Sequence, residues 1–283
     1  MHLRKPVTYI LILIAVVEVV LPLLMFLGRN KLIFLPSTLP SPEDALGELG
    51  ALDARLVRIR RPDGRELAAY DAAPRGDAGR ARPVVLFLHG NAGNVAQRAP
   101  LLAWFTTVTD SRVLLLDYSG YGGNAGSASE HEINVDALAA QDWLVVHGVP
   151  ASRIIVYGES IGCAPALVVA TQRDVAGVVL QAPMSSLSSM ARHLYPWLPL
   201  VSLLASGDFP NAKRAAAVDV PLLVVHGTED EIVPFTEGQK LHATAGAGAE
   251  LMPVEGAGHN DLIQVGGVRY LRDLGERFRG WTR

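Results

Sequence analysis

The sequence has few of the residues that mark several common classes of protein. A single cysteine, Cys163, excludes an internal disulfide framework and leaves the cellular compartment undecided. Neither a His-Glu-x-x-His motif nor a cluster of cysteines occurs, so the sequence indicates no metal site, and we expect no cofactor. Basic and acidic side chains nearly cancel to a net charge of −3 without a long basic run, which argues against nucleic acid as a partner.

One stretch near the amino terminus is much more apolar than the rest. Residues 7–27 are nearly all aliphatic, and their length matches the hydrocarbon core of a bilayer. Glu18 lies near the centre and costs roughly 3 kcal/mol on the insertion scale, but some sixteen apolar residues each return about 0.3 to 0.6 kcal/mol. The exit sequence at 26–30 lacks an Ala-x-Ala-like cleavage site, which favours an uncleaved transmembrane anchor over a signal peptide.

Charges on either side of this stretch give its expected orientation. Arg4, Lys5 and the free amino group precede it, and Arg29 and Lys31 follow it. The slight excess of positive charge before the span favours an amino end in the cytoplasm and a large domain on the extracytoplasmic side. We therefore expect the protein to contact the lipid bilayer through this helix.

The chain divides by composition into an anchor, a connector and one domain. We expect the anchor at 1–28, the connector at 29–53 and a single α/β domain at 54–283. The connector begins apolar and becomes proline-rich, so we expect it at the membrane surface or against the domain. Apolar residues make up 49% of the chain, which is enough to build a sizeable core in one domain.

Within the domain, apolar strands alternate with helices, a pattern typical of a mostly parallel sheet covered on both faces. The turn signal Pro62-Asp63-Gly64 lies between the first two expected strands and predicts that they form an antiparallel hairpin. Ser129 and Glu132 have capping-box spacing, which predicts the start of a helix. The expected strands are 54–61, 65–73, 84–88, 113–117, 154–157, 175–180, 222–226 and 250–254. The expected helices are 95–107, 130–147, 160–171, 236–245 and 263–278.

The connection from 181 to 220 is too long for a plain crossover. One interpretation is a single crossover helix with packing residues. The other is a small apolar lid at about 183–212 that receives an acyl chain, with Met184, Leu187, Tyr195 and Trp197 as contacts for the substrate. Its length argues against a large cap domain.

The motif Gly-Glu-Ser-Ile-Gly at 158–162 stands between a β-branched run and an alanine- and leucine-rich segment. This order predicts a strand, a sharp turn and a helix. Gly158 and Gly162 leave room for a tightly packed turn that lifts the Ser160 hydroxyl clear of the sheet. The motif alone also fits a turn with an incidental serine, so the rest of the chain must supply a base, an acid and an oxyanion turn.

The partners of such a serine are expected later in the chain, in the order acid and then histidine, each after a strand. Asp230 follows the strand at 222–226, and His259 follows the strand at 250–254 in a glycine-rich loop. A histidine titrates near neutral pH and can take the serine proton, while the aspartate holds the imidazole in the required tautomer. Ser160, His259 and Asp230 are therefore the candidate nucleophile, base and acid.

Other acidic and histidine residues are less suitable. Glu229 and Glu231 flank Asp230 and are expected to be solvated. Asp117 precedes the serine in sequence and is expected to shape the loop after it, while Asp261 is expected to orient the histidine loop. The remaining histidines are expected on the surface or in structural positions, including the strand ends at 89 and 226.

The segment Leu-His-Gly-Asn-Ala-Gly-Asn at 88–94 follows a strand and predicts an oxyanion turn. We expect the backbone N–H of Asn91 to stabilise the oxyanion together with that of Ile161. Ala92 is the alternative donor, and is otherwise a contact for the substrate.

Together with Asp-Tyr-Ser-Gly-Tyr-Gly at 117–122, these motifs resemble those of α/β-hydrolase-fold serine hydrolases. A single apolar helix followed by a Leu-Ile-Phe-x-Pro-like connector at 32–36 is similar to their membrane-anchored α/β-hydrolase-domain branch. The resemblance covers essentially the whole chain and implies a triad of Ser160, Asp230 and His259. It also implies ester or thioester hydrolysis. Cys163 stands where many members have a second glycine.

We consider two classes of function. The first is a membrane-anchored serine hydrolase that cleaves a small-molecule or lipid carboxylic ester through an acyl-enzyme on Ser160, with thioesterase or peptidase activity as alternatives on the same triad. The second is a non-catalytic binding protein with the same fold, against which the intact candidate residues argue. Dehalogenase and epoxide hydrolase chemistry need an aspartate where this chain has serine.

Overall fold

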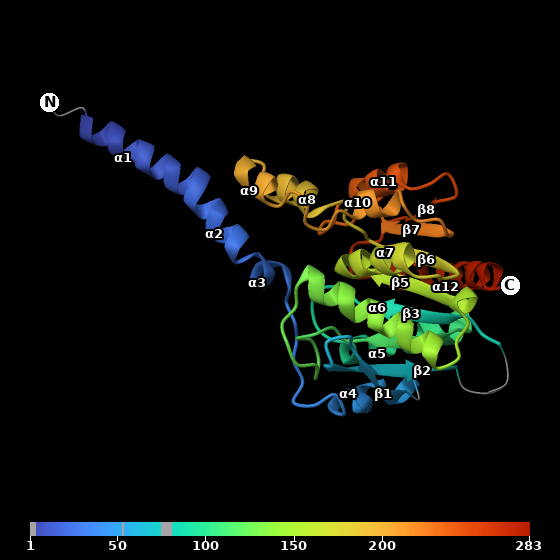
Figure 1. The fold of residues 1–283 in the computed structure, drawn as a ribbon. Coiled ribbons are helices and arrows are strands. Elements are labelled where there is room, and N and C mark those ends of the chain that lie inside the picture. Colours follow the sequence, from blue (N-terminus) through green and yellow to red (C-terminus); the bar gives the residue numbers. More distant parts are fainter. Residues whose placement is uncertain (1–3, 53, 75–80) are drawn as a thin grey trace.

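The computed structural model describes residues 4–52, 54–74 and 81–283. In this part of the chain the strands form one eight-stranded sheet in the order β1-β2-β4-β3-β5-β6-β7-β8 (Figure 1). β2 pairs antiparallel with β1 and β4, and all other pairings are parallel, so the predicted fold class is confirmed. The strands are β1 (Arg55–Arg60), β2 (Glu66–Ala72), β3 (Val84–Leu88), β4 (Arg112–Leu116), β5 (Ile154–Glu159), β6 (Gly177–Gln181), β7 (Leu222–Gly227) and β8 (Glu250–Val254).

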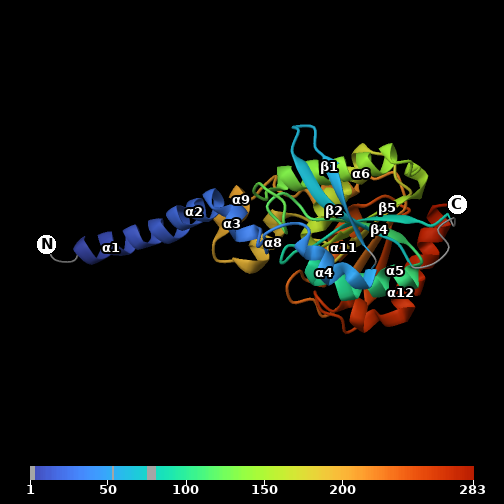
Figure 2. The same cartoon turned by 90° about the horizontal axis from the view of Figure 1, so that it is seen from below.

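Helices cover both faces of this sheet (Figure 2). The expected helices are present, with ends that differ by a few residues, and Ser129 accepts a hydrogen bond from the Glu132 N–H at the start of α6, as the capping-box spacing predicts. The helices of the domain are α4 (Asp44–Glu48), α5 (Ala99–Thr109), α6 (Glu130–Val146), α7 (Cys163–Gln172), α8 (Leu187–Leu194), α9 (Pro199–Leu204), α10 (Asn211–Ala215), α11 (Phe235–Thr244) and α12 (Leu262–Trp281).

Two hydrophobic cores lie on opposite faces of the sheet, and β3 contributes to both. Side chains alternate between faces along a strand. Accordingly, Leu86 and Leu88 pack with α6, α7 and α11, whereas Val85 and Phe87 pack with α5 and α12. Full burial of each such side chain contributes about 1.5 to 3 kcal/mol. The apolar run of β3 is therefore explained by burial on both faces.

The connector packs along the domain and is not a free linker. It contains α4 and the 3-10 turn Leu49–Leu52, neither of which the sequence analysis predicted, and the side chains of Leu49 and Leu52 are buried in the core beside α5. Pro36 and Thr38 form parallel bridges with Gly93 and Gly122. The amino-terminal segment is thus attached to the loops at the carboxyl ends of β3 and β4.

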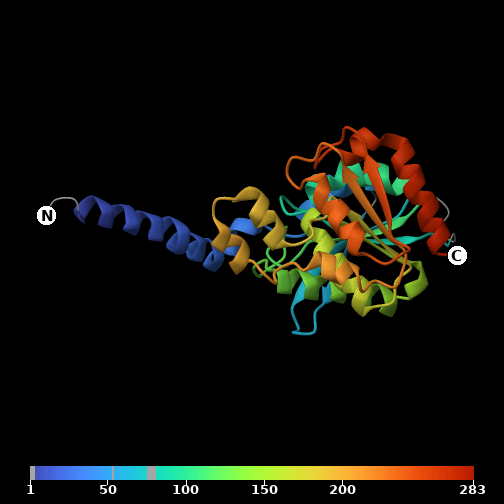
Figure 3. The same cartoon turned by 90° about the horizontal axis from the view of Figure 1, so that it is seen from above.

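The apolar amino-terminal stretch forms a helical rod that projects away from the domain (Figures 1 and 3). It consists of α1 (Arg4–Ala15), a π-helical turn (Val16–Val20) and α2 (Leu21–Leu27). Pro22 has no N–H to donate to the carbonyl of Glu18, and the preceding N–H, that of Leu21, bonds back to the carbonyl of Val16. The wide turn therefore accommodates the proline without ending the helix.

The connection after β6 contains three short helices, α8, α9 and α10, and not the single crossover helix that was one of the two expectations. The other expectation, a small apolar lid, stays a prediction. The Ser186 hydroxyl accepts a hydrogen bond from the Ser189 N–H and caps the start of α8. Pro196 disfavours helical backbone at Tyr195, which ends α8, and Pro199 begins α9. The two prolines therefore divide the segment.

Candidate active site

The motif at 158–162 forms a sharp turn between β5 and α7. Ser160 has a φ of 54°, a left-handed conformation that is strained for a residue with a side chain. A Cβ on Gly158 would lie 2.5 Å from the carbonyl oxygen of Gly162, and one on Gly162 would collide with the carbonyl oxygen of Leu88. Glycine at both positions therefore permits the turn that holds the serine at the carboxyl end of the sheet.

Ser160, His259 and Asp230 come together at this edge from the ends of β5, β8 and β7. His259 Nε2 lies 2.9 Å from Ser160 Oγ, and its Nδ1 lies 2.7 Å from Asp230 Oδ2. The Asp230 side chain is fully buried, and the His259 side chain is 9% exposed. This arrangement lets the imidazole accept the serine proton on one nitrogen while the other donates to the carboxylate.

Asp230 is held by contacts on both carboxyl oxygens. Its Oδ1 accepts hydrogen bonds from the N–H groups of Ile232 and Val233, at 2.9 and 2.8 Å. Its Oδ2 also lies 3.2 Å from His226 Nε2. Burial alone would raise the pKa of Asp230, but hydrogen bonds from His226 and His259 outweigh it and hold the pKa below its ordinary value. Asp230 is therefore ionised at neutral pH, as the orienting acid must be.

The loops that carry the acid and the histidine are joined to each other. The Glu229 N–H donates to the Ala257 carbonyl at 2.9 Å, and the Thr228 N–H donates to the Val254 carbonyl at 3.1 Å. Asp261 accepts a hydrogen bond from the Gly258 N–H at 2.7 Å, one residue before the histidine. Backbone contacts thus fix the separation of Asp230 and His259.

The turn after β3 lies beside the serine turn, but the side chain of Asn91 faces the connector. Its Oδ1 accepts hydrogen bonds from the Leu35 N–H at 2.9 Å and from the Tyr121 hydroxyl at 3.2 Å. The Ile161 N–H belongs to the first turn of a helix, where N–H groups have no partner within the helix. The side chain of Asn91 thus anchors the turn, which leaves the backbone of Asn91 or Ala92 for the predicted role beside Ile161.

Arg98 connects this turn to the serine turn, a role that the sequence analysis did not predict. Its guanidinium donates to the carbonyls of Ala92 and Asn94, both at 3.1 Å, and to both carboxyl oxygens of Glu159, at 3.1 and 3.3 Å. Glu159 immediately precedes Ser160. A bidentate arginine pair of this kind fixes geometry as well as charge. Arg98 therefore fixes the position of the expected oxyanion turn relative to the serine.

A buried polar cluster packs beside the turn after β3 and supports it. Asp117 accepts a hydrogen bond from the Val95 N–H at 3.0 Å and lies 3.4 Å from His89. The Tyr118 hydroxyl donates to the carbonyl of His89 at 2.9 Å. The Asn124 side chain donates to the Asp117 carbonyl at 2.8 Å, so Asp117 helps to shape the loop that follows β4. His89 is fully buried at the strand end, and His226 supports Asp230 directly.

The four expected substrate contacts lie in different surroundings. Met184 is buried directly after β6, and its carbonyl accepts a hydrogen bond from Asn211. Leu187 and Tyr195 line a cavity that they share with the amino-terminal helix. The side chain of Trp197 is 58% exposed. The structure thus brings Leu187 and Tyr195 together and leaves Met184 and Trp197 apart from them.

Cys163 is fully buried in the first turn of α7, where its thiol donates to the carbonyls of Gly158 and Gln181 at 3.2 and 3.3 Å. Burial raises the pKa of this thiol well above its ordinary value. Cys163 is thus a packing residue at the base of the turn. Across the described ranges, no group of three or more His, Cys, Asp or Glu residues is arranged to hold a metal ion.

Comparisons with known proteins agree with this architecture. Residues 83–214 match the model of a family described as α/β hydrolase fold. The chain is 40% identical over 252 residues to an uncharacterized protein of Mycobacterium tuberculosis, a match that covers 88% of this chain and 86% of that protein. It is 31% identical over 234 residues to alpha/beta hydrolase domain-containing protein aho-3 of Caenorhabditis elegans, covering 82% and 68%. An esterase of Pyrococcus furiosus, 20% identical, superposes with a TM-score of 0.68 over 89% of this chain and 98% of its own. The chain belongs to the α/β hydrolase fold family.

Proposed function

We propose that the protein is a membrane-anchored serine hydrolase that cleaves carboxylic esters through an acyl-enzyme on Ser160. One observation carries the proposal: Ser160, His259 and Asp230 form a continuous hydrogen-bonded chain at the carboxyl edge of the sheet, at 2.9 and 2.7 Å. A serine hydroxyl is a weak nucleophile at neutral pH and needs such a base. The strained serine turn and the buried, ionised aspartate support the same role.

In the first half of the proposed reaction, Ser160 Oγ attacks the ester carbonyl carbon while His259 Nε2 accepts the hydroxyl proton. The carbonyl oxygen becomes an oxyanion, which the backbone N–H groups of Ile161 and Asn91 stabilise. The bond to the alcohol oxygen then breaks, and His259 returns its proton to the leaving alcohol. The acyl group remains on Ser160.

In the second half, water replaces the alcohol. His259 accepts a proton from the water as it attacks the acyl carbonyl, and the tetrahedral intermediate collapses to release the carboxylic acid. The proton returns to Ser160 Oγ, which regenerates the free hydroxyl. Asp230 stays ionised throughout and stabilises the imidazolium that forms in each half.

The anchor is part of the same proposal. Val7–Leu27 is long and apolar enough to cross a bilayer, and an 18-residue stretch within it has a mean hydropathy of 3.0, with 6% of its residues buried against the rest of the protein. Arg29 forms an ion pair with Asp208 at 2.8 Å, which neutralises one of the two basic residues after the span. The positive-inside rule counts basic groups and not net charge, so the orientation rests on the free amino group, Arg4 and Lys5 before the span against Arg29 and Lys31 after it, a slight excess that favours an extracytoplasmic domain. A protein anchored by this span should stay in the membrane when alkaline carbonate extracts peripheral proteins. If the domain is extracytoplasmic, a protease added outside intact cells should cleave it.

Labelling with a fluorophosphonate probe tests the chemistry. The full-length protein should react, and Ser160→Ala should abolish the reaction because the probe needs the activated hydroxyl. Ser152→Ala is the matched control, since Ser152 is exposed at the opposite edge of the sheet, before β5. A folded wild-type protein that fails to label would overturn the proposal in favour of a non-catalytic binding protein.

A substrate series defines the acyl group and the bond that is cleaved. Turnover of p-nitrophenyl esters from acetyl to longer chains should rise with chain length if the apolar segment after β6 receives the acyl chain. A preference for acetyl over octanoyl would count against that reading. Matched thioesters and anilides of one acyl chain then compare the three activities that the same triad can support.

A further inference from the structure

The surface formed by α8 and α9 is apolar and unusually exposed. Leu194, Trp197 and Leu203 have exposed fractions of 53%, 58% and 68%. The sequence contains no aspartate or glutamate from 184 to 207, and Arg192 and His193 are its only basic residues. Large apolar side chains exposed on two helices that pack on each other are uncommon on a soluble surface and indicate a partner that buries them.

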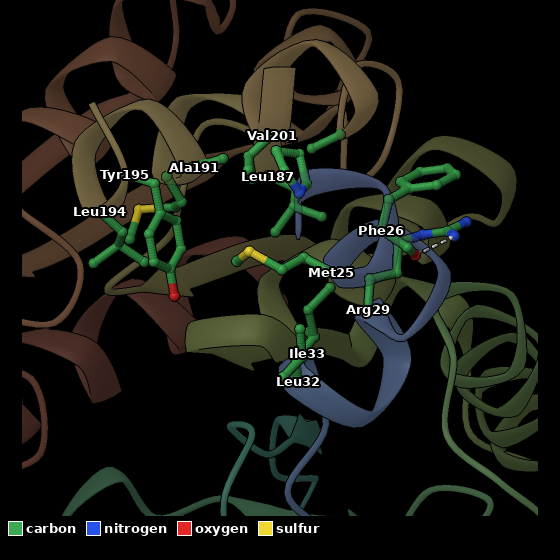
Figure 4. Close-up of a pocket in the computed structure, with 13 residues that line it drawn as sticks. Met25, Phe26, Arg29, Leu32, Ile33, Leu187, Ala191, Leu194, Tyr195 and Val201 are labelled. Atoms are coloured by element: carbon green, nitrogen blue, oxygen red, sulfur yellow. Dashed lines mark hydrogen bonds between the residues drawn. The ribbon is translucent and has the colours of Figure 1, made fainter. Parts of the chain in front are cut away.

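α9 lies next to the α2 end of the amino-terminal rod, and α8 packs beside α9 (Figures 2 and 3). α9 packs against α2 and against the π-helical turn at Val16–Val20. Between the rod and α8 is a cavity of about 160 Å³, and Figure 4 shows Met25 extending into it toward Leu187 and Tyr195. Arg29 closes the contact through its ion pair with Asp208. The rod is therefore a packing partner of α8 and α9.

The position of this contact along the rod sets its depth. Val17 and Glu18 are the half-buried residues of the π-helical turn and lie ten and nine residues before Leu27, the last residue of the apolar span, so a helical rise of 1.5 Å per residue places them about 14 to 15 Å inside the end of that span. Interfacial amphipathic helices bury their apolar face about 5 to 10 Å into the boundary of a bilayer. A helix that packs on this turn and on α2 therefore lies between the end of the span and that depth, a range that includes the interfacial layer, if the span crosses the membrane.

We propose that α8 and α9 form a second membrane contact, with Leu194, Trp197 and Leu203 inserted into the interfacial layer of the bilayer that holds Val7–Leu27. This proposal rests on the anchor in the proposed function. It specifies a lipid bilayer as the partner of the surface. Tryptophan at the boundary and apolar leucines below it are typical of interfacial segments. The segment of α8 and α9 would then lie in the membrane and meet acyl chains there.

Cysteine accessibility in vesicles tests the proposal. The only native cysteine, Cys163, is fully buried, so the full chain is a silent background for single added cysteines. We would compare Leu203→Cys with Val146→Cys in phosphatidylcholine and phosphatidylglycerol vesicles, using a charged maleimide that stays outside. Val146 is 81% exposed on α6, away from the rod, and reports the outward-facing fraction. Leu203→Cys should react at least about tenfold more slowly, because the thiolate is the reactive form and apolar surroundings disfavour it.

The experiment separates failure of the second membrane contact from failure of the anchor. Equal rates at the two positions in protein that floats with the vesicles would overturn the second membrane contact and leave the anchor intact. Protein that does not float would overturn both. If Leu203→Cys labels slowly in crowded vesicles but faster when the protein is diluted to one copy per vesicle, a protein partner and not the bilayer covers the surface. Trp197 provides a second readout, since its fluorescence should be quenched by lipids brominated near the top of the acyl chain, and Trp197→Phe should remove the quenched component.

Discussion

The serine turn and the α8–α9 surface are held by opposite kinds of contact. At the serine turn, directional polar contacts hold each element: Arg98 bonds to Glu159, and Asp230 bonds to His259 and to two backbone N–H groups. At the rod and the α8–α9 surface, the contacts are mostly apolar, with the Arg29–Asp208 ion pair at the edge. Polar contacts define angles and distances, whereas apolar contacts respond to the medium around them.

This difference separates two kinds of effect that mutations should have. Changes at the serine turn should alter the chemical step by large factors and be insensitive to the membrane. Changes at the rod and the α8–α9 surface should leave the chemical step almost unaltered and act through stability and lipid contact. The following predictions test that separation, beginning with the largest effect.

Asp230→Asn should lower kcat for a soluble ester by about 10⁴-fold, because the amide favours the wrong tautomer of His259. Glu231→Gln is the matched control, since its carboxyl is adjacent in sequence and exposed, and its turnover should match the wild type. Steady-state kinetics of both variants in detergent and in vesicles measures the effect. A loss of less than tenfold would mean that His259 does not depend on Asp230.

Arg98→Met and Glu159→Gln should each lower kcat by about 10- to 100-fold, somewhat less than removal of an oxyanion donor itself. Each change frees the turn at Asn91 and Ala92 from the serine turn, so the loss should appear in kcat with little change in KM. The double variant should be no slower than either single variant, because both remove the same contact. Additive losses would mean that the two side chains act separately.

The residues of the site could be predicted because they follow strand ends in a fixed order. Ser160 is flanked by glycines that only a tight turn requires, and Asp230 and His259 each follow an apolar strand that ends at one edge of the sheet. The parallel sheet converts this sequence order into spatial proximity. For Asn91, the sequence does not show whether the side chain or the backbone N–H faces the serine.

The residues that support the site were not predictable in the same way. Arg98 and Glu159 are 61 positions apart, and neither stands in a periodic pattern that predicts their contact. The connector was expected at the membrane surface or against the domain, but its helix α4 was not predicted, because that helix forms where its apolar side chains find a core to pack against. Likewise, α12 continues past Gly267, which has a φ of 63° and kinks it, to reach Trp281. Such features depend on tertiary packing.

Acid should weaken the contribution of Asp230 to stability. Its pKa is lower in the folded protein than the ordinary value near 3.9, so the stabilisation is fully present above that value and is lost as pH falls toward the folded pKa. The difference in free energy of unfolding between the wild type and Asp230→Asn should therefore narrow below about pH 4. Chemical denaturation from neutral to acidic pH measures it. A difference that widens in acid would contradict the depressed pKa.

Arg29→Ala should have the smallest effect on the chemical step. The Arg29 and Asp208 side chains are 37% and 26% exposed, so solvent screens their ion pair, and its loss should cost at most about 1 kcal/mol of unfolding free energy in detergent. Arg173→Ala is the matched control, because Arg173 pairs with Asp142 at an exposed site far along the chain from the rod. In vesicles Arg29→Ala should raise the maleimide reactivity of a cysteine at Leu203, since the pair holds the rod against the end of α9, and Arg173→Ala should not. If the two variants behave alike, the ion pair does not help to hold the rod against α9, and apolar packing alone keeps the two together.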